Sequence, residues 1–256
     1  MVAGMGLLLA VSSILIWGIA GLLVAAIAVG ALYFASPRIP PGMLMRFYGA
    51  RRVDMARGGQ LSDILHALVA RTELQNIPQL YIVPSMMLNA FAVGNQSNAA
   101  IALTEGLLRR LDAPEIAAVL AHEISHIKNN DLAVMGLADI MSRFTLALSY
   151  LAAFLAVTNI FFLFTAGEAY VSWLGILLLY LAPAVSSLLQ LGLSRAREYD
   201  ADLSAARLTG DPSALASALQ KLDRYTGHFW EDLMFPVPGR RVPQPSVLRS
   251  HPTTEE

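Results

Sequence analysis

The chain has 256 residues, of which 55% are apolar and only 14% are charged, and its mean hydropathy is +0.53. About a quarter of the residues in ordinary soluble domains carry charge, so we expect part of this chain to lie in a bilayer. The net charge of -1 disfavours a nucleic-acid partner. The absence of cysteine excludes disulfides, thiolate zinc sites, iron–sulfur clusters and a cysteine nucleophile.

The first predicted element is a membrane span near the N-terminus. No charged side chain precedes Arg38, and Ala3 to Phe34 is an almost unbroken apolar run. A bilayer core needs roughly 20 residues of helix, so this run predicts one long, tilted span and is too short for two. A cleaved signal peptide is the alternative, but it would have a basic n-region and a much shorter apolar run. We therefore expect a retained anchor.

The next block predicts one helix and a small sheet. Residues 61–75 have apolar side chains at helical spacing, which indicates an amphipathic helix. Short apolar runs follow and predict two or three strands, with a hairpin loop at 94–98. These runs are 80–83, 88–93 and 99–103.

A second helix has clear start and stop signals. Asp112 is a good N-cap, and Glu115 three residues later completes an Asp variant of the capping box. The helix should run from about Ala113 to Lys128, because Asn129 and the next asparagine are poor helix residues.

Two further spans are predicted as a helical hairpin, at residues 144–165 and 169–194, neither of which contains an ionisable side chain. Channels and transporters usually place such groups at bilayer depth, so that class of function is disfavoured. We expect the third span to continue as a helix to about Leu208. A shorter helix, capped by Asp211, should then reach about Tyr225.

Arginines next to the spans predict the orientation. They follow the first span, precede the second and follow the third, and the opposite side has none. By the positive-inside rule, the N-terminus lies outside, and residues 35–143 and 195–256 are cytoplasmic. The two polar blocks can therefore form one domain.

The helix predicted over 113–128 contains an H-E-x-x-H pattern, from His122 to His126. Histidines four residues apart lie on one helix face, about 6 Å apart along the axis, so both imidazoles can reach one zinc ion. Glu123 stands beside the first histidine, where it can take a proton from the attacking water and later deliver it to the leaving amine. A polar helix face whose histidines are satisfied by carboxylates is the alternative.

A catalytic zinc takes three protein ligands and keeps a fourth position open. Because cysteine is absent and few histidines remain, an acidic residue on another helix is the natural third ligand. Glu198 lies just after the third span, and Asp202, four residues on, can accept a hydrogen bond from a ligand histidine. By spacing alone, a solvated helix face that balances neighbouring arginines explains these acids equally well.

Together these residues resemble the HtpX-type membrane zinc metalloproteases, which are related to the CAAX prenyl endopeptidases. Four motifs carry the resemblance: residues 89–94, the H-E-x-x-H helix, the hairpin of spans, and the run Ser194 to Asp202. It covers most of residues 78–225 and also residues 251–256.

The resemblance implies one Zn²⁺ per chain, bound by His122, His126 and Glu198. It also makes Glu123 the general base and Asp202 a partner that orients a ligand histidine.

The resemblance further implies a substrate-binding strand that contains Asn89, Ala90 and Phe91. An edge strand offers unpaired main-chain groups to which an extended peptide can add itself. A buried strand followed by a hairpin turn is equally compatible with these residues.

The chain departs from the family in two ways. The family's prototypes have two spans before the catalytic domain, whereas this sequence has room for one. The family's pattern also usually continues beyond the position of Glu256, which leaves the role of His251 open. Arg195, Arg197 and His228 are all candidates to stabilise the oxyanion, and the sequence does not choose among them.

We therefore predict a mainly α-helical integral membrane protein with about three transmembrane helices and a gluzincin-like α+β metalloprotease domain that contains a small β-sheet. Residues 1–37 form the N-terminal anchor, and residues 144–194 form the hairpin. The catalytic domain is divided between residues 38–143, with the H-E-x-x-H helix, and residues 195–256, with the third zinc ligand and an extended tail.

The predicted function is a zinc-dependent endopeptidase with polypeptide substrates. The resemblance implies protein quality control of misfolded or membrane proteins, at a bacterial inner membrane, with the catalytic domain in the cytoplasm. A catalytically silent zinc-binding membrane scaffold or assembly factor is the alternative; the presence of Glu123 disfavours it, because structural zinc sites fill all four positions. An intramembrane protease is disfavoured since Glu115 and Lys128 make the motif helix too polar to span a bilayer.

Overall fold

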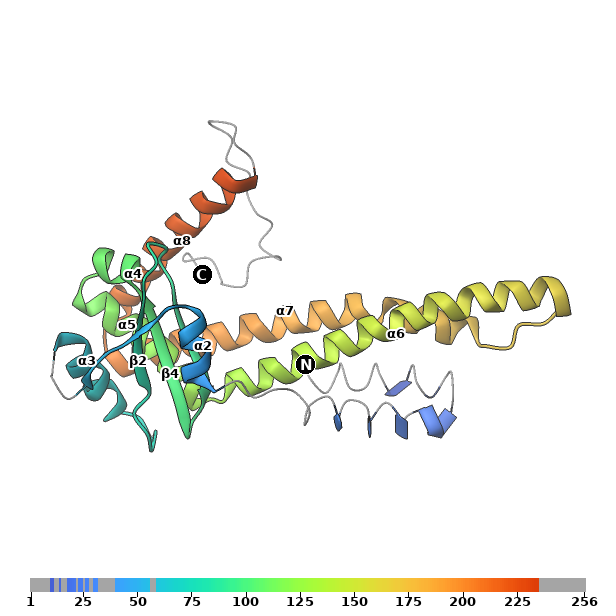
Figure 1. Cartoon of the computed structure of the whole chain (residues 1–256), viewed down its shortest axis with the longest axis horizontal. Helices are drawn as coiled ribbons and strands as arrows, with labels where there is room; N and C mark the ends of the chain where they lie inside the picture. Colours follow the sequence, from blue (N-terminus) through green and yellow to red (C-terminus); the bar gives the residue numbers. More distant parts are fainter. Residues whose placement is uncertain are drawn as a thin grey trace. The chain divides into compact units, whose positions relative to one another are not determined.

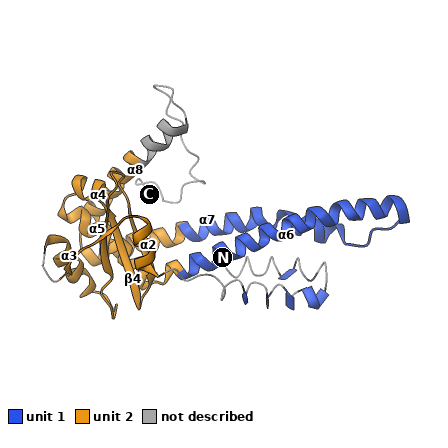
Figure 2. Cartoon of the chain, in the orientation of Figure 1, with its two compact units in different colours: residues 1–38, 133–194 blue, residues 39–132, 195–256 orange. Residues whose placement is uncertain are grey.

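Figure 1 shows the fold of the chain as a computed structural model. It describes residues 40–55 and 59–234, with side chains as far as 225, and scattered positions between 10 and 31. The predicted N-terminal span therefore lies mostly outside the described residues, and the predicted extended tail beyond 234, including His251, lies wholly outside them. Two compact units are present, residues 1–38 with 133–194 and residues 39–132 with 195–256 (Figure 2).

The second unit contains a four-stranded mixed sheet in the order β1-β2-β4-β3. β2 and β4 pair in parallel, and the other two pairs are antiparallel. The strands are β1 Arg51–Arg52, β2 Gln79–Val83, β3 Ala90–Asn95 and β4 Asn98–Thr104. The three predicted apolar runs form β2, β3 and β4, which confirms the small sheet. The fourth strand, β1, was not predicted, because it is a pair of arginines without the apolar run that signals a strand.

The β3–β4 hairpin has a tighter turn than predicted. Asn95 pairs with Asn98, so only Gln96 and Ser97 remain as the loop. The side-chain oxygen of Asn95 accepts hydrogen bonds from the N–H groups of Ser97 and Asn98, at 3.1 and 3.0 Å. This local bonding closes the turn within two residues and lengthens both strands.

Five helices surround this sheet: α2 Pro41–Phe47, α3 Gln60–Val69, α4 Glu105–Arg110, α5 Ala113–Lys128 and α8 Pro212–Met234. α3 is shorter than predicted, because the chain turns after Val69 and the Thr72 hydroxyl donates to the Val69 carbonyl at 2.8 Å. α8 is longer than predicted and continues past Tyr225, since no proline occurs before Pro236.

Both faces of the sheet are covered, which places α5 in the core. Side chains alternate across β4: Ile101 and Leu103 belong to a large core cluster with the α5 residues Leu120 and Ile124. The intervening alanines, Ala100 among them, pack on the opposite face with Met45 of α2. A strand buried on both faces has a continuous apolar sequence, as 99–103 does.

The predicted bounds of α5 are confirmed, and local hydrogen bonds set them. Asp112 accepts a hydrogen bond from the Glu115 N–H at 3.0 Å, and the Glu115 carboxylate accepts one from the Asp112 N–H at 2.9 Å. At the other end Asn129 is the C-cap, and Asn130 has a φ of 55°, a left-handed conformation that asparagine tolerates.

The first unit contains most of two long helices, α6 Asp131–Ala166 and α7 Trp173–Thr209. Both are long and apolar enough to cross a membrane, judged by length and composition, and they contain the two spans predicted for the hairpin. Buried Asn159 ties the hairpin turn: its amide donates to the Val171 carbonyl at 2.8 Å and accepts from the Tyr170 and Val171 N–H groups.

Glu115 joins α5 to α8, and we predict that Glu115→Gln weakens the fold by about 2 kcal/mol at neutral pH. The carboxylate is 3% exposed, accepts from Ser217 at 2.7 Å, and lies 2.6 Å from the Lys221 ammonium. The variant would leave the Lys221 charge without its partner. Thermal unfolding in detergent measures the loss, and Glu73→Gln, at a side chain that is 92% exposed, should change little.

The same pair predicts a pH dependence. Burial raises the pKa of Glu115, but the hydrogen bonds from Lys221, Ser217 and the Asp112 backbone outweigh it and hold the pKa below 4.5. Because the folded-state pKa is lowered, the stabilisation is complete above about pH 4.5 and is lost as the pH falls through the folded-state value. The difference between the unmodified chain and Glu115→Gln should therefore shrink in acid; a constant difference would contradict this account.

Candidate metal centre

Helix α5 places both motif histidines on one face, as the spacing predicts. The Nε2 atoms of His122 and His126 lie 3.1 Å apart, and their rings meet edge to face. His122 is buried, at 8% exposure, and so is Glu123, at 9%. The two imidazoles therefore converge on one small volume beside a buried carboxylate.

Each imidazole is held by a different aspartate. Asp202 of α7 lies 2.8 Å from His122 Nδ1, and Asp131, the first residue of α6, lies 2.9 Å from His126 Nδ1. An ionised carboxylate only accepts hydrogen bonds, so each Nδ1 carries a proton, and in a neutral imidazole the Nε2 lone pair is then free to bind a cation. Two neutral imidazoles would point their Nε2 lone pairs at each other, so this arrangement requires a cation between them, either a proton that one Nε2 donates to the other or a metal ion.

Glu198 completes the group. Its Oε2 lies 3.3 Å from His122 Nε2, and its Oε1 lies 3.9 Å from His126 Nε2. Ligands of a tetrahedral ion at about 2.0–2.1 Å lie roughly 3.3 Å from one another. One ligand atom of each of the three residues lies within 4.8 Å of the others, so the group is compact enough to close around such an ion. Among the described residues these three are the set that can hold a metal ion.

The charges around the imidazoles favour a cation. Burial lowers the pKa of His122, but hydrogen bonds to Asp202 and Glu198, with the charge of Glu123, outweigh it and raise the pKa to about 10. Four carboxylates thus lie close to two imidazoles in a small space. Such a set binds positive charge strongly, as a metal site must.

Glu123 faces the edge of the sheet. Burial raises its pKa, and the Ala92 N–H, which donates to the carboxylate, partly offsets this, as do the two histidines. β3 is the last strand of the sheet, so one of its edges has no strand partner in the described part of the chain. The Glu123 carboxylate and the edge of β3 without a strand partner are therefore neighbours.

The three residues predicted to bind substrate lie at the start of β3. Asn89 precedes the strand with an exposed side chain, and its main chain pairs with Thr104. Ala90 and Phe91 begin the strand, and the Phe91 ring packs against Tyr48 with 5.2 Å between centroids.

Asp131 is a candidate site residue that the sequence analysis missed. Its side chain is only 3% exposed, and its second oxygen lies 3.3 Å from the Arg197 guanidinium. The asparagine pair after α5 could have indicated this residue. A turn at Asn129 and Asn130 brings the next residue, Asp131, back beside the end of α5. Two of the residues predicted as candidates to stabilise the oxyanion can be assessed here. Arg197 forms an ion pair with Asp131, and the His228 side chain lies outside the described part of the chain.

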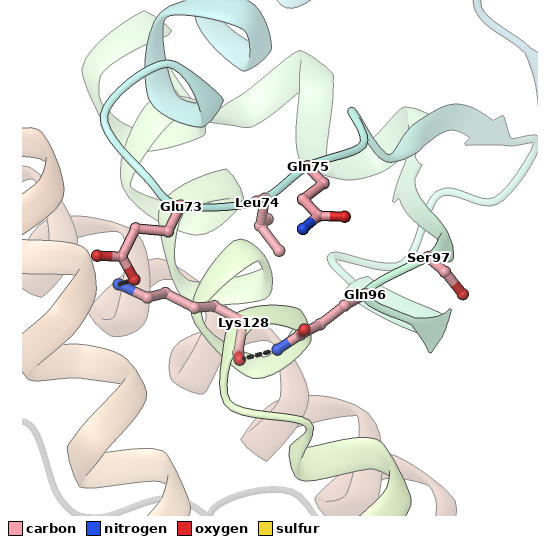
Figure 3. A pocket seen from close by; sticks show the side chains of 6 residues that line it. All are labelled: Glu73, Leu74, Gln75, Gln96, Ser97 and Lys128. Carbon is pink, nitrogen blue, oxygen red and sulfur yellow. Dashed lines mark hydrogen bonds and ion pairs between the residues drawn. The ribbon is translucent and has the colours of Figure 1, made fainter.

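A separate pocket of about 290 Å³ lies at the C-terminal end of α5 (Figure 3). The Gln96 side chain closes one side by donating to the Lys128 carbonyl at 2.6 Å. It is lined by Glu73, Leu74, Gln75, Gln96, Ser97 and Lys128. None of these residues belongs to the histidine–carboxylate group.

Comparison with known proteins defines this chain as a metalloprotease. Two relatives named "Protease HtpX homolog" are similar over most of its length. That of Methylibium petroleiphilum is 36% identical and covers 88% of this chain and 77% of the relative. That of Aquifex aeolicus is 34% identical and covers 98% and 86%. The chain belongs to peptidase family M48, whose sequence profile matches residues 55–256. The resemblance inferred from the motifs is confirmed.

A solved structure, Ste24p of S. mikatae, is also similar, with 19% sequence identity and a TM-score of 0.48. The match covers 91% of this chain and 54% of that one, so this chain spans about half the length of Ste24p.

We predict that Asp131→Asn weakens metal binding by about 10- to 100-fold, because the neutral amide no longer holds the His126 ring with a charged acceptor. Competition with a fluorescent zinc chelator measures the affinity. Asp63→Asn, at an exposed position in the first turn of α3, is the matched control and should bind as the unmodified chain does. Equal affinities for both variants would show that Asp131 does not position the ligand.

Proposed function

We propose that this protein is a zinc-dependent endopeptidase embedded in a membrane, with one Zn²⁺ per chain. The observation that carries the proposal is the convergence of the His122 and His126 Nε2 atoms with the Glu198 carboxylate. Two imidazole nitrogens and one carboxylate oxygen are the ligand set of many catalytic zinc sites, and a three-residue set leaves a fourth position for substrate.

The residues divide the chemistry among them. His122, His126 and Glu198 hold the metal, which when bound polarises the scissile carbonyl and makes water more acidic. Glu123 accepts the proton of the attacking water and returns it to the leaving amine. Burial raises the pKa of Glu123, which helps it to hold the proton between the two halves of that transfer.

The free edge of β3 binds the substrate main chain in this proposal. An extended polypeptide that pairs with the edge passes Glu123, since the Ala92 N–H donates to that carboxylate. Asn89, Ala90 and Phe91 then contact the substrate at one end of the paired segment. Main-chain pairing requires an unfolded segment but little sequence preference, which suits misfolded proteins and unstructured loops of membrane proteins.

The proposed topology has three spans: the anchor within residues 1–37 and a hairpin over residues 144–194, formed by α6 and α7. The gluzincin-like catalytic domain consists of residues 38–143 and 195–256. Arginines flank every span on the domain side, which supports a cytoplasmic domain at a bacterial inner membrane and a role in protein quality control.

Glu123→Gln tests the assignment of the base. The amide has nearly the shape of the carboxylate but cannot accept the proton, so we expect cleavage of an unfolded protein to fall by about 10²- to 10⁴-fold. Zinc content should stay at about one per chain, because the three ligands are untouched. Cleavage of a denatured, fluorescently labelled protein by the detergent-purified chain, with metal analysis of both preparations, gives the two readouts.

Glu198→Ala is the companion variant and should lose both zinc and activity. If the unmodified chain holds zinc but cuts no unfolded substrate in several detergents, the endopeptidase proposal is wrong and a zinc-binding scaffold replaces it. If Glu123→Gln cuts at the normal rate, another group is the base.

A further inference from the structure

The short helix α2 carries an exposed surface that the catalytic proposal does not use. Phe47 is 75% exposed, and Met43, one turn before it, and Tyr48 are each 52% exposed. Arg46 on the same helix is also exposed, and so is Arg52 of β1, the strand that follows α2 in the chain. Large apolar side chains grouped in this way indicate a binding surface. We call this set the α2 surface: Met43, Arg46, Phe47, Tyr48 and Arg52.

The α2 surface is firmly mounted on the sheet. Met45, on the inner side of α2, is fully buried against the face that includes Tyr81 and Ala102. The Tyr48 ring packs on Phe91 of β3. Because the inner side is anchored in this way, the outer side chains are presented in a fixed arrangement.

Positive charge predominates near α2, although one arginine, Arg51, is paired with Glu105 at 2.7 Å. No acidic residue precedes Asp54, whereas arginines occur at 38, 46, 51 and 52. Apolar side chains with arginines among them complement the boundary of a bilayer that contains anionic headgroups. A second copy of the chain would bring the same positive surface, so self-association here is disfavoured.

The position in the chain also points to a bilayer. The apolar run ends at Phe34 and α2 begins at Pro41. Seven residues span at most about 25 Å, so in the proposed topology α2 follows the end of the first span at a short distance along the chain. A tether this short makes the local concentration of the membrane surface high.

We propose that the α2 surface docks on the anionic headgroup region of the cytoplasmic leaflet, an inference that rests on the membrane topology proposed above. Met43, Phe47 and Tyr48 enter the interface, and Arg46 and Arg52 contact lipid phosphates. This contact fixes the side of the sheet that carries α2 against the bilayer.

The absence of cysteine makes the test simple, because one introduced cysteine can be labelled selectively. Met43→Cys carries an environment-sensitive fluorophore, and the full chain is reconstituted in phosphatidylcholine vesicles with or without phosphatidylglycerol. A small share of the lipid bears a nitroxide on its headgroup. Quenching at position 43 should be at least about threefold stronger than at a Glu73→Cys control, and it should need phosphatidylglycerol. Arg46→Glu with Arg52→Glu should reduce it to the control level.

Equal quenching at the two positions overturns the proposal, and a label at Phe47→Cys must give the same answer as the label at Met43→Cys. If quenching depends on the amount of protein per vesicle and not on the phosphatidylglycerol content, the α2 surface binds a second copy of the chain. Quenching that unfolded polypeptide displaces assigns it to substrate. The same measurement in a Glu123→Gln background needs no proteolysis, so its result is separate from the success or failure of the endopeptidase proposal.

Discussion

The close approach of two imidazole nitrogens is the constraint on which the rest of the catalytic unit depends. At 3.1 Å, the Nε2 atoms of His122 and His126 present their lone pairs to the same volume. This arrangement is unfavourable for two neutral histidines unless a cation lies between them. Other groups must therefore hold the two rings in place. The two aspartates fix the protonated nitrogens, and Glu198 adds a negative donor. The site is therefore built to have its energy lowered by a metal ion.

The rigidity of this arrangement comes from the burial of α5. The helix lies between the sheet and α8, and most of its residues are buried. Its first turn is fixed twice, by the capping box with Asp112 and by the ion pair of Glu115 with Lys221. A ligand helix held at its start and along its length keeps the histidines in place without help from flexible loops.

The acidic groups come from helices that also contain the long apolar segments. Asp131 begins α6, and Glu198 and Asp202 lie on the polar part of α7. Each of these two helices therefore contains both a carboxylate of the site and a long apolar segment. Chain continuity therefore links the proposed metal site to the proposed membrane anchor.

The sequence by itself determined the features that depend on neighbouring residues. The bounds of α5 follow from a capping box and an asparagine stop, and the facing histidines follow from helical periodicity. The two apolar helices followed from composition. Tertiary structure decided the rest, because packing brings together residues that are distant in the chain. Sequence spacing alone did not decide whether Glu198 and Asp202 belong to a metal site or to a solvated helix face. Only the tertiary structure set their distances to His122. The position of Asp131 beside His126 depended on a left-handed turn at Asn130. The strand β1 depended on pairing with β2, which no pattern in its two arginines indicates.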